Sequence, residues 1–226
     1  NCFNAMSHKT VKFIIKQKRN NMLKIISSSF ALITFSLFVF TGCSNHDEFL
    51  KTSPNELSIA DDCRNSNKNF EMDCYDLISY KNSYAQLRLA FNAQLRGNFE
   101  EAIKRLNTAK QKGNFYANAP LAEIHKSGYG VPINDKIAKS LLEETKEIDP
   151  MAAYKLYFYY IEDDDIEDAF ELLNYAASSN LKAAQLELSN FYKKGEYIER
   201  DSDKADYWNE QYQDKTNSFT NKIYGK

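Results

Sequence analysis

Three cysteines of this 226-residue chain, Cys43, Cys63 and Cys74, are candidates for modification or for disulfide formation. Cys43 ends a run of apolar and small residues, and Cys63 and Cys74 follow with ten residues between them. A pair at that separation can form a disulfide in an oxidising compartment or remain as two free thiols. A metal site is disfavoured, because no CxxC motif and no nearby His accompanies the pair. The sequence predicts a disulfide between Cys63 and Cys74, with free thiols as the alternative.

The sequence contains no recognisable catalytic or metal-binding constellation. The two histidines after position 43, His46 and His125, belong to no catalytic triad or zinc motif, and His125 is interpreted as a packing residue. The acidic run at 162–165 lacks EF-hand spacing, so it is interpreted as a loop that caps the next helix. We therefore expect a protein that is not an enzyme, with no catalytic residue, no metal site and no cofactor.

The segment that leads to Cys43 resembles the export signal of bacterial lipoproteins. After Met22 and Lys24 it has an apolar run from Ile25 to Phe40 and then Thr41-Gly42-Cys43, which is similar to the lipobox cut by signal peptidase II. Phe40 departs from that pattern, which prefers an aliphatic residue. The resemblance implies a signal peptide at 22–42 and a lipid on Cys43 that holds the protein on the periplasmic face of a membrane. A free Cys43 at the end of an uncleaved anchor helix is the alternative.

The residues on either side of this signal carry three further predictions. Residues 1–21 are interpreted as an upstream extension, with Met22 as the start and Met6 as an alternative. In enterobacterial lipoproteins an Asp after the lipidated Cys retains the protein in the inner membrane, so Ser44 favours the outer membrane. Residues 43–68 are polar and rich in Asn and Ser, which predicts a flexible linker after the lipidated Cys.

The charge balance excludes nucleic acid as the expected partner. The first 42 residues carry six of the 29 basic side chains and no acidic one, so 23 basic and 31 acidic groups remain in the rest. Affinity for nucleic acid rests on clustered Lys and Arg, whereas these are scattered through an acidic body. With 43% hydrophobic residues, seven Gly and four Pro, the composition favours a packed helical domain.

Helical patterns recur with a nearly constant period between positions 84 and 214. Each unit has an amphipathic pattern that begins near a small residue, a turn, and a second amphipathic pattern. The small anchors are separated by 32, 35 and 32 residues, a period typical of helical-repeat arrays. These anchors are Ala85, Ala117, Ala152 and Ala184.

The units resemble tetratricopeptide and Sel1-like repeats. The G-N-F-E-E-A run from Gly97 is similar to the first family and the G-x-G-V-P turn from Gly128 to the second. Gly195 stands ten positions before Ala205, as Gly128 stands before Ala138. A phosphate-binding loop is the alternative for the Gly128 turn, which lacks the Lys-Ser/Thr that such a loop needs. The resemblance implies an all-α αα-hairpin repeat solenoid of about four repeats at 69–215. Residues 216–226 are expected to be a polar C-terminal tail that caps the last hairpin.

The resemblance also implies that a protein or peptide partner binds on a concave face lined by the first helix of each repeat. Tyr154 and Phe158 are the proposed anchor, against the alternative that neighbouring repeats bury the whole aromatic run at 157–160. The expected function is a membrane-anchored interaction scaffold, with an immunity lipoprotein against a phospholipase-type toxin of type VI secretion as the alternative. By the family's helix positions, Leu87 and Leu186 also face inward, and the predicted partner-binding residues are Tyr84, Phe91, Glu123, Lys126, Tyr154, Phe158, Asn190 and Lys193.

Overall fold

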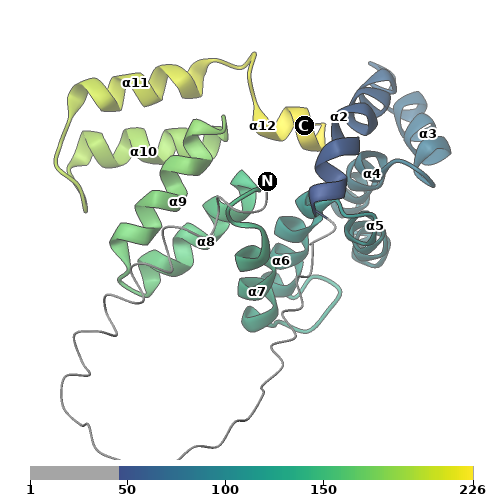
Figure 1. Ribbon diagram of the computed structural model, residues 1–226, viewed down its shortest axis with the longest axis horizontal. Coiled ribbons are helices and arrows are strands. Elements are labelled where there is room, and N and C mark those ends of the chain that lie inside the picture. The colour runs from purple at the N-terminus through teal and green to yellow at the C-terminus, as the bar shows by residue number, and fades with distance from the viewer. Residues whose placement is uncertain (1–45, 226) are drawn as a thin grey trace, which may run out of the picture. The chain divides into compact units, whose positions relative to one another are not determined.

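The computed structural model describes residues 46–225, and the chain forms eleven α-helices and one 3-10 helix in that range (Figure 1). No strand occurs among these residues, which confirms the predicted all-α fold. The predicted upstream extension at 1–21, the signal peptide at 22–42 and the lipid site Cys43 lie outside the described residues. None of the described helices is long and apolar enough to cross a membrane.

Eight of the helices form four consecutive αα-hairpins. Within each hairpin the two helices contact each other more extensively than either contacts any other helix. We call the first helix of each hairpin the A helix and the second the B helix. The hairpins are α4 (Ser83–Leu95) with α5 (Phe99–Gln111), α6 (Asn118–Ser127) with α7 (Asp135–Thr145), α8 (Pro150–Glu162) with α9 (Ile166–Ser178), and α10 (Lys182–Lys194) with α11 (Ser202–Gln213).

The small residues of the sequence period lie where the helices pack together. All four Ala anchors have an exposed fraction of 0%, as do Ala102 and Ala169 on the B helices of the first and third hairpins. A methyl side chain at these points allows two helix backbones to approach closely, and the neighbouring Leu side chains fill the remaining space. The predicted repeat period is therefore confirmed as a packing period.

The second and fourth hairpins turn in the same way. Gly128 and Gly195 end their A helices in the left-handed conformation, with φ of 72° and 73°, which a residue with a Cβ adopts at a cost. Each B helix then begins at a polar cap: the side chain of Asn134 accepts a hydrogen bond from the Ile137 N–H, and Asp201 accepts one from the Lys204 N–H. The shared Gly-to-Ala spacing thus encodes one turn geometry used twice.

Two helices precede the first hairpin, and the first of them corrects the predicted linker. Residues 46–62 form the helix α2 (His46–Asp62), with Pro54 inside it, and α3 (Lys68–Ile78) follows. The expectation of a flexible linker over 43–68 is therefore wrong for most of that range. Cys63 and Cys74 are joined by a disulfide that links the end of α2 to α3, which agrees with the predicted pair.

Contacts with α4 explain why α2 is ordered despite its polar composition. The Phe49 ring is buried and lies 5.8 Å from the ring of Tyr84. The Ser53 hydroxyl and the Tyr84 phenol share a hydrogen bond of 2.6 Å, and the Glu56 carboxylate accepts hydrogen bonds from the N–H and the hydroxyl of Ser83. Tertiary packing supplies the stability that local propensity does not.

The residues predicted as a tail form a helix that returns to the first hairpin. The helix α12 (Phe219–Tyr224) packs against α4, and it lies next to α4 and α2 in Figure 1. One backbone hydrogen bond, from the Phe219 N–H to the Asn180 carbonyl, also ties it to the turn between α9 and α10. The expectation that residues 216–226 cap the last hairpin is therefore wrong: these residues connect that part of the molecule to the first repeat.

Candidate functional site

A groove runs across three consecutive A helices and contains most of the predicted partner-binding residues. It consists of two adjoining cavities of about 160 and 150 Å³ that share Glu123 and Lys155. We call it the A-helix groove. Its lining residues are Phe91 and Gln94 on α4, Pro120, Ala122, Glu123 and Lys126 on α6, Leu142 on α7, Met151, Tyr154, Lys155, Phe158 and Tyr159 on α8, and Tyr224 on α12.

An ion pair lies where the two cavities join. The Lys155 Nζ is 2.6 Å from the Glu123 Oε2, and the Ser127 hydroxyl donates to the Glu123 Oε1 at 3.0 Å. The hydrogen bond from Lys155 holds the pKa of Glu123 below its usual value, so this carboxylate is charged at neutral pH. The pair joins α6 to α8 and fixes two side chains of the groove in place.

A second cation lies beside the first. The Lys126 Nζ is 4.5 Å from the centre of the Tyr159 ring, a distance at which the ring face attracts the ammonium group. No carboxylate lies within ion-pairing distance of Lys126 in the part of the chain that the structure describes. Glu123 is already paired with Lys155, and the Tyr159 phenol donates to the Asp135 carboxylate at 3.3 Å. Lys126 is therefore held at the groove by a ring face and not by an ion pair.

The aromatic run of α8 divides between the core and the groove. Tyr157 is buried, whereas Tyr159 and Tyr160 are half-buried, and the Lys146 Nζ donates to the Tyr160 phenol at 2.9 Å. Phe158 keeps 39% of its surface exposed, and its ring packs edge-on against Tyr154 at 5.2 Å. Neighbouring elements therefore bury one of the four rings fully, and Phe158 is left open at the groove.

Five of the eight predicted partner-binding residues lie together in the groove, and three do not. Tyr84 is only 1% exposed beneath Phe49 and Ser53, so the prediction that it faces a partner is wrong because α2 covers it. Leu87, expected to face inward, is likewise buried. Asn190 and Lys193 line a separate cavity of about 280 Å³ against α11, together with Leu186, Arg200 and Asp206.

Eight of the thirteen lining residues were not among the predicted partner-binding residues, and three of them show why. Met151 and Lys155 precede Phe158 by seven and three positions, so they share its helical face, and this spacing could have identified them. Tyr224 could not have been found in that way. It reaches the groove because its phenol donates to the Tyr116 carbonyl at 3.1 Å, a contact between residues 108 positions apart.

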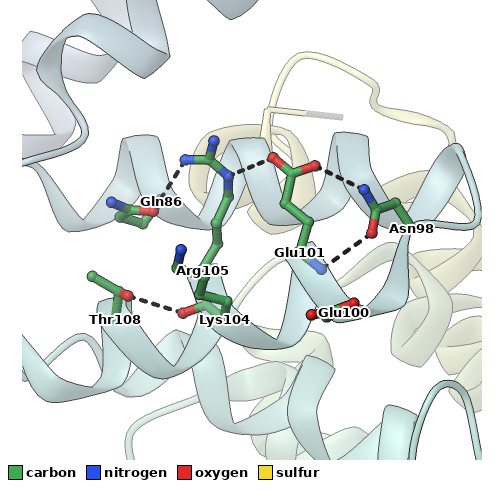
Figure 2. A pocket seen from close by; sticks show the side chains of 7 residues that line it. All are labelled: Gln86, Asn98, Glu100, Glu101, Lys104, Arg105 and Thr108. Carbon is green, nitrogen blue, oxygen red and sulfur yellow. Dashed lines mark hydrogen bonds and ion pairs between the residues drawn. The ribbon is translucent and has the colours of Figure 1, made fainter.

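A further cavity, on the first hairpin, has a different character. It measures about 470 Å³ on the surface of α5, and Figure 2 shows the hydrogen bonds that join Gln86, Asn98, Glu101 and Arg105 along it. The Arg105 Nε donates to the Glu101 Oε1 at 2.9 Å, and the Asn98 amide donates to the same carboxylate at 3.1 Å. No group of three or more His, Cys, Asp or Glu in residues 46–225 is arranged to hold a metal ion. Because Asn98, Glu101 and Arg105 already bind one another, this surface is a poorer candidate for binding than the A-helix groove.

Comparison with known proteins identifies the fold. No protein-family model matches the sequence, and no curated protein matches it. Among solved structures, the chain is similar to c5321, a protective antigen of uropathogenic Escherichia coli strains that displays an SLR (Sel1-like repeat) fold, with 21% identity over 74% of this chain and a TM-score of 0.53. It spans 40% of the length of that protein.

A second similar structure is a Sel1 repeat protein from Oxalobacter formigenes, with 20% identity over 74% of this chain and 76% of that one and a TM-score of 0.55. At such identities the likeness concerns the fold. The chain therefore has a Sel1-like repeat fold, as the turn at Gly128 and the repeat period predict.

Proposed function

We propose that the protein is a non-catalytic scaffold of the bacterial cell envelope that is anchored by a lipid on Cys43 and holds a protein or peptide partner in the A-helix groove. The observation that carries this proposal is the groove itself, in which five predicted residues from three repeats come together beside an open aromatic ring. Arrays of helical repeats commonly bind their partners along such extended surfaces.

The chemistry of the groove indicates what kind of segment it accepts. The cavity of about 150 Å³ is floored by Ala122 and Leu142 and walled by Tyr154 and Phe158, which suits one apolar side chain of the partner. The Lys126 ammonium group, which is held by a ring face and not by an ion pair, suits a carboxylate next to that side chain. We therefore expect a partner segment with an apolar residue close to an acidic one.

Affinity capture from a detergent-solubilised envelope fraction tests the binding proposal. Phe158→Ala with Tyr154→Ala should abolish recovery of the partner while shifting the thermal midpoint by only a few degrees, because neither side chain is fully buried. The matched control is Phe70→Ala, which removes the same ring from α3, outside the groove and 68% exposed. Equal losses for the groove variant and the control would contradict the proposal. Recovery of a phospholipase-type toxin as the partner would decide for the immunity alternative.

The anchor is tested separately. Mass spectrometry of the unmodified protein from the membrane fraction should find a chain that begins at Cys43 and carries diacylglycerol on that residue. Cys43→Ser should lose both the lipid and the cut before position 43. A mature chain with an unmodified Cys43 would contradict the lipid anchor and would leave the binding proposal intact.

A further inference from the structure

The helix α12 occupies one end of the A-helix groove. Its Tyr224 ring packs edge-on against Phe91 of α4 at 4.7 Å, and its Phe219 ring packs against Tyr116 at 5.6 Å. Phe219, Ile223 and Tyr224 are all buried, and Tyr224 forms part of the wall of the 160 Å³ cavity. The helix α12, at the end of the described chain, thus covers part of the surface of α4.

The surface on which α12 packs includes Arg88, Phe91 and Tyr116, and we call it the seat. Contacts that do not involve α12 also hold Arg88 and Tyr116 in place. The Arg88 guanidinium, which donates to the Lys222 carbonyl at 3.3 Å, also binds the Asp61 carboxylate at 2.6 Å and the Ala60 carbonyl at 2.7 Å. The Tyr116 ring contacts the rings of Phe49, Tyr84 and Phe115. The seat would therefore persist after α12 leaves it, which is the property of a preformed binding site.

The connection to α12 permits such a departure. Residues 213–217, which lead from α11 to α12, are exposed, and the chain is non-helical from position 214. Among the helices, α12 packs mainly on α4. A helix of six residues has little stability of its own and depends on its seat. Phe219 and Ile223 stand four positions apart and share one face of the helix, as the anchors of segments that bind in grooves do.

We propose that α12 is an internal ligand that occupies the α4 end of the A-helix groove, dissociates from it reversibly, and competes there with the partner segment. This inference rests on the proposed function and adds a means of regulating the same site. Release of α12 lengthens the groove by uncovering Phe91 and Tyr116, so the full partner segment binds only to the open form. The occupant is thus the Phe219–Tyr224 segment, and a partner with the same spacing of apolar residues displaces it.

The test uses the full chain and a fluorescent peptide of residues 217–226 as the probe. In the Phe219→Ala/Tyr224→Ala chain the seat should be vacant, and the peptide should bind at least ten times more tightly than to the unmodified chain. A peptide that carries the same two substitutions should not bind. Lys222→Ala is the matched control, because that side chain is exposed, and it should leave the seat as closed as in the unmodified chain.

Two outcomes would overturn the proposal. The first is a double variant that keeps its helical circular dichroism and does not bind the peptide. The second comes from hydrogen exchange on the unmodified chain, where the amides of α12 should exchange well before those of α4; equal protection would make α12 part of the core. If the peptide binds but no envelope partner is captured, the internal ligand stands and the scaffold proposal fails.

Discussion

At the scale of single residues, one carboxyl group stands out from a series of helix caps. Asn82, Asn114 and Asp149 occupy equivalent places before three successive repeats, and each side chain accepts a hydrogen bond from a backbone N–H that follows it. Asp149 is completely buried, and its second carboxylate oxygen has no hydrogen-bond donor among the described residues. Burial raises the pKa of Asp149 to about 7, which outweighs the backbone hydrogen bonds that lower it.

This pKa makes the free energy of unfolding depend on pH in a defined direction. Between about pH 4 and pH 7 the folded chain holds a proton on Asp149 that the unfolded chain releases, so stability falls as pH rises through this window. Asp149→Asn keeps the cap to the Met151 N–H and removes the titration. From pH 5 to pH 8, the free energy of unfolding of the variant relative to that of the unmodified chain should rise by on the order of 2 kcal/mol.

Urea unfolding of both chains at pH 5, 6, 7 and 8 checks this prediction. Asp149→Ala is the control that also loses the cap, and it should be less stable than Asp149→Asn by about 1 kcal/mol at every pH. Parallel pH profiles for the unmodified chain and Asp149→Asn would show that Asp149 does not titrate in this range.

At the scale of the elements, the eight repeat helices could be predicted from the sequence and the flanking helices could not. The signals for α4 to α11 are local: small anchors every 32 to 35 residues, Gly at the turns and polar caps. The order of α2 and α12 depends on side chains such as Phe49 and Tyr224 that pack on α4 from distant positions. The same holds for the residues of the candidate site. The exposure of Phe158 and Lys126 at the groove follows from their repeat positions, whereas the burial of Tyr84 depends on α2, which covers it.

Gly97 and Gly128 have the same positive φ, so a comparison of the two separates the backbone strain of an added Cβ from its steric clash. Gly97 and Gly128 both have φ of +72°, but a Cβ on Gly97 would meet no atom within 4 Å, whereas one on Gly128 would lie 2.7 Å from Ile133 Cγ1. Gly97→Ala should therefore cost about 1 kcal/mol from backbone strain alone. Gly128→Ala should cost about 1 kcal/mol more, because Ile133 must move.

Chemical denaturation of the two variants tests this difference. Adding Ile133→Ala to Gly128→Ala provides the control, since the smaller side chain should reduce the effect of the glycine substitution to that of Gly97→Ala. Equal destabilisation by the two single substitutions would show that the contact with Ile133 contributes nothing.

At the scale of the whole molecule, α12 connects the first and the last hairpins, which do not stack on each other directly. Repeat arrays are stabilised by contacts between neighbours, so their terminal units can unfold separately. Here the Phe219 N–H binds the Asn180 carbonyl while the Arg64 guanidinium binds the Asn221 carbonyl at 2.7 Å, across 157 positions of sequence. The last hairpins and the first are therefore coupled through one short helix.

The single tryptophan, Trp208 on α11, reports on the last hairpin. In the unmodified chain we expect thermal unfolding followed by Trp208 fluorescence to coincide with that followed by circular dichroism. In Phe219→Ala/Tyr224→Ala the fluorescence transition should occur about 5 °C before the other, because the last hairpin loses its tie to the first. Coincident transitions in both chains would show that stacking alone makes the array cooperative.

The helix α2 has a consequence for the distance at which the proposed anchor would hold the protein. Two residues separate Cys43 from His46, where α2 begins, so an extended chain spans at most about 11 Å between the two Cα atoms. With acyl chains on Cys43, the repeat array would sit directly above the lipid headgroups, and its packing against α2 would restrict the directions in which the groove can point. Such a protein meets its partners by diffusing in the plane of the membrane, so partners that are themselves bound to that membrane would be encountered most often.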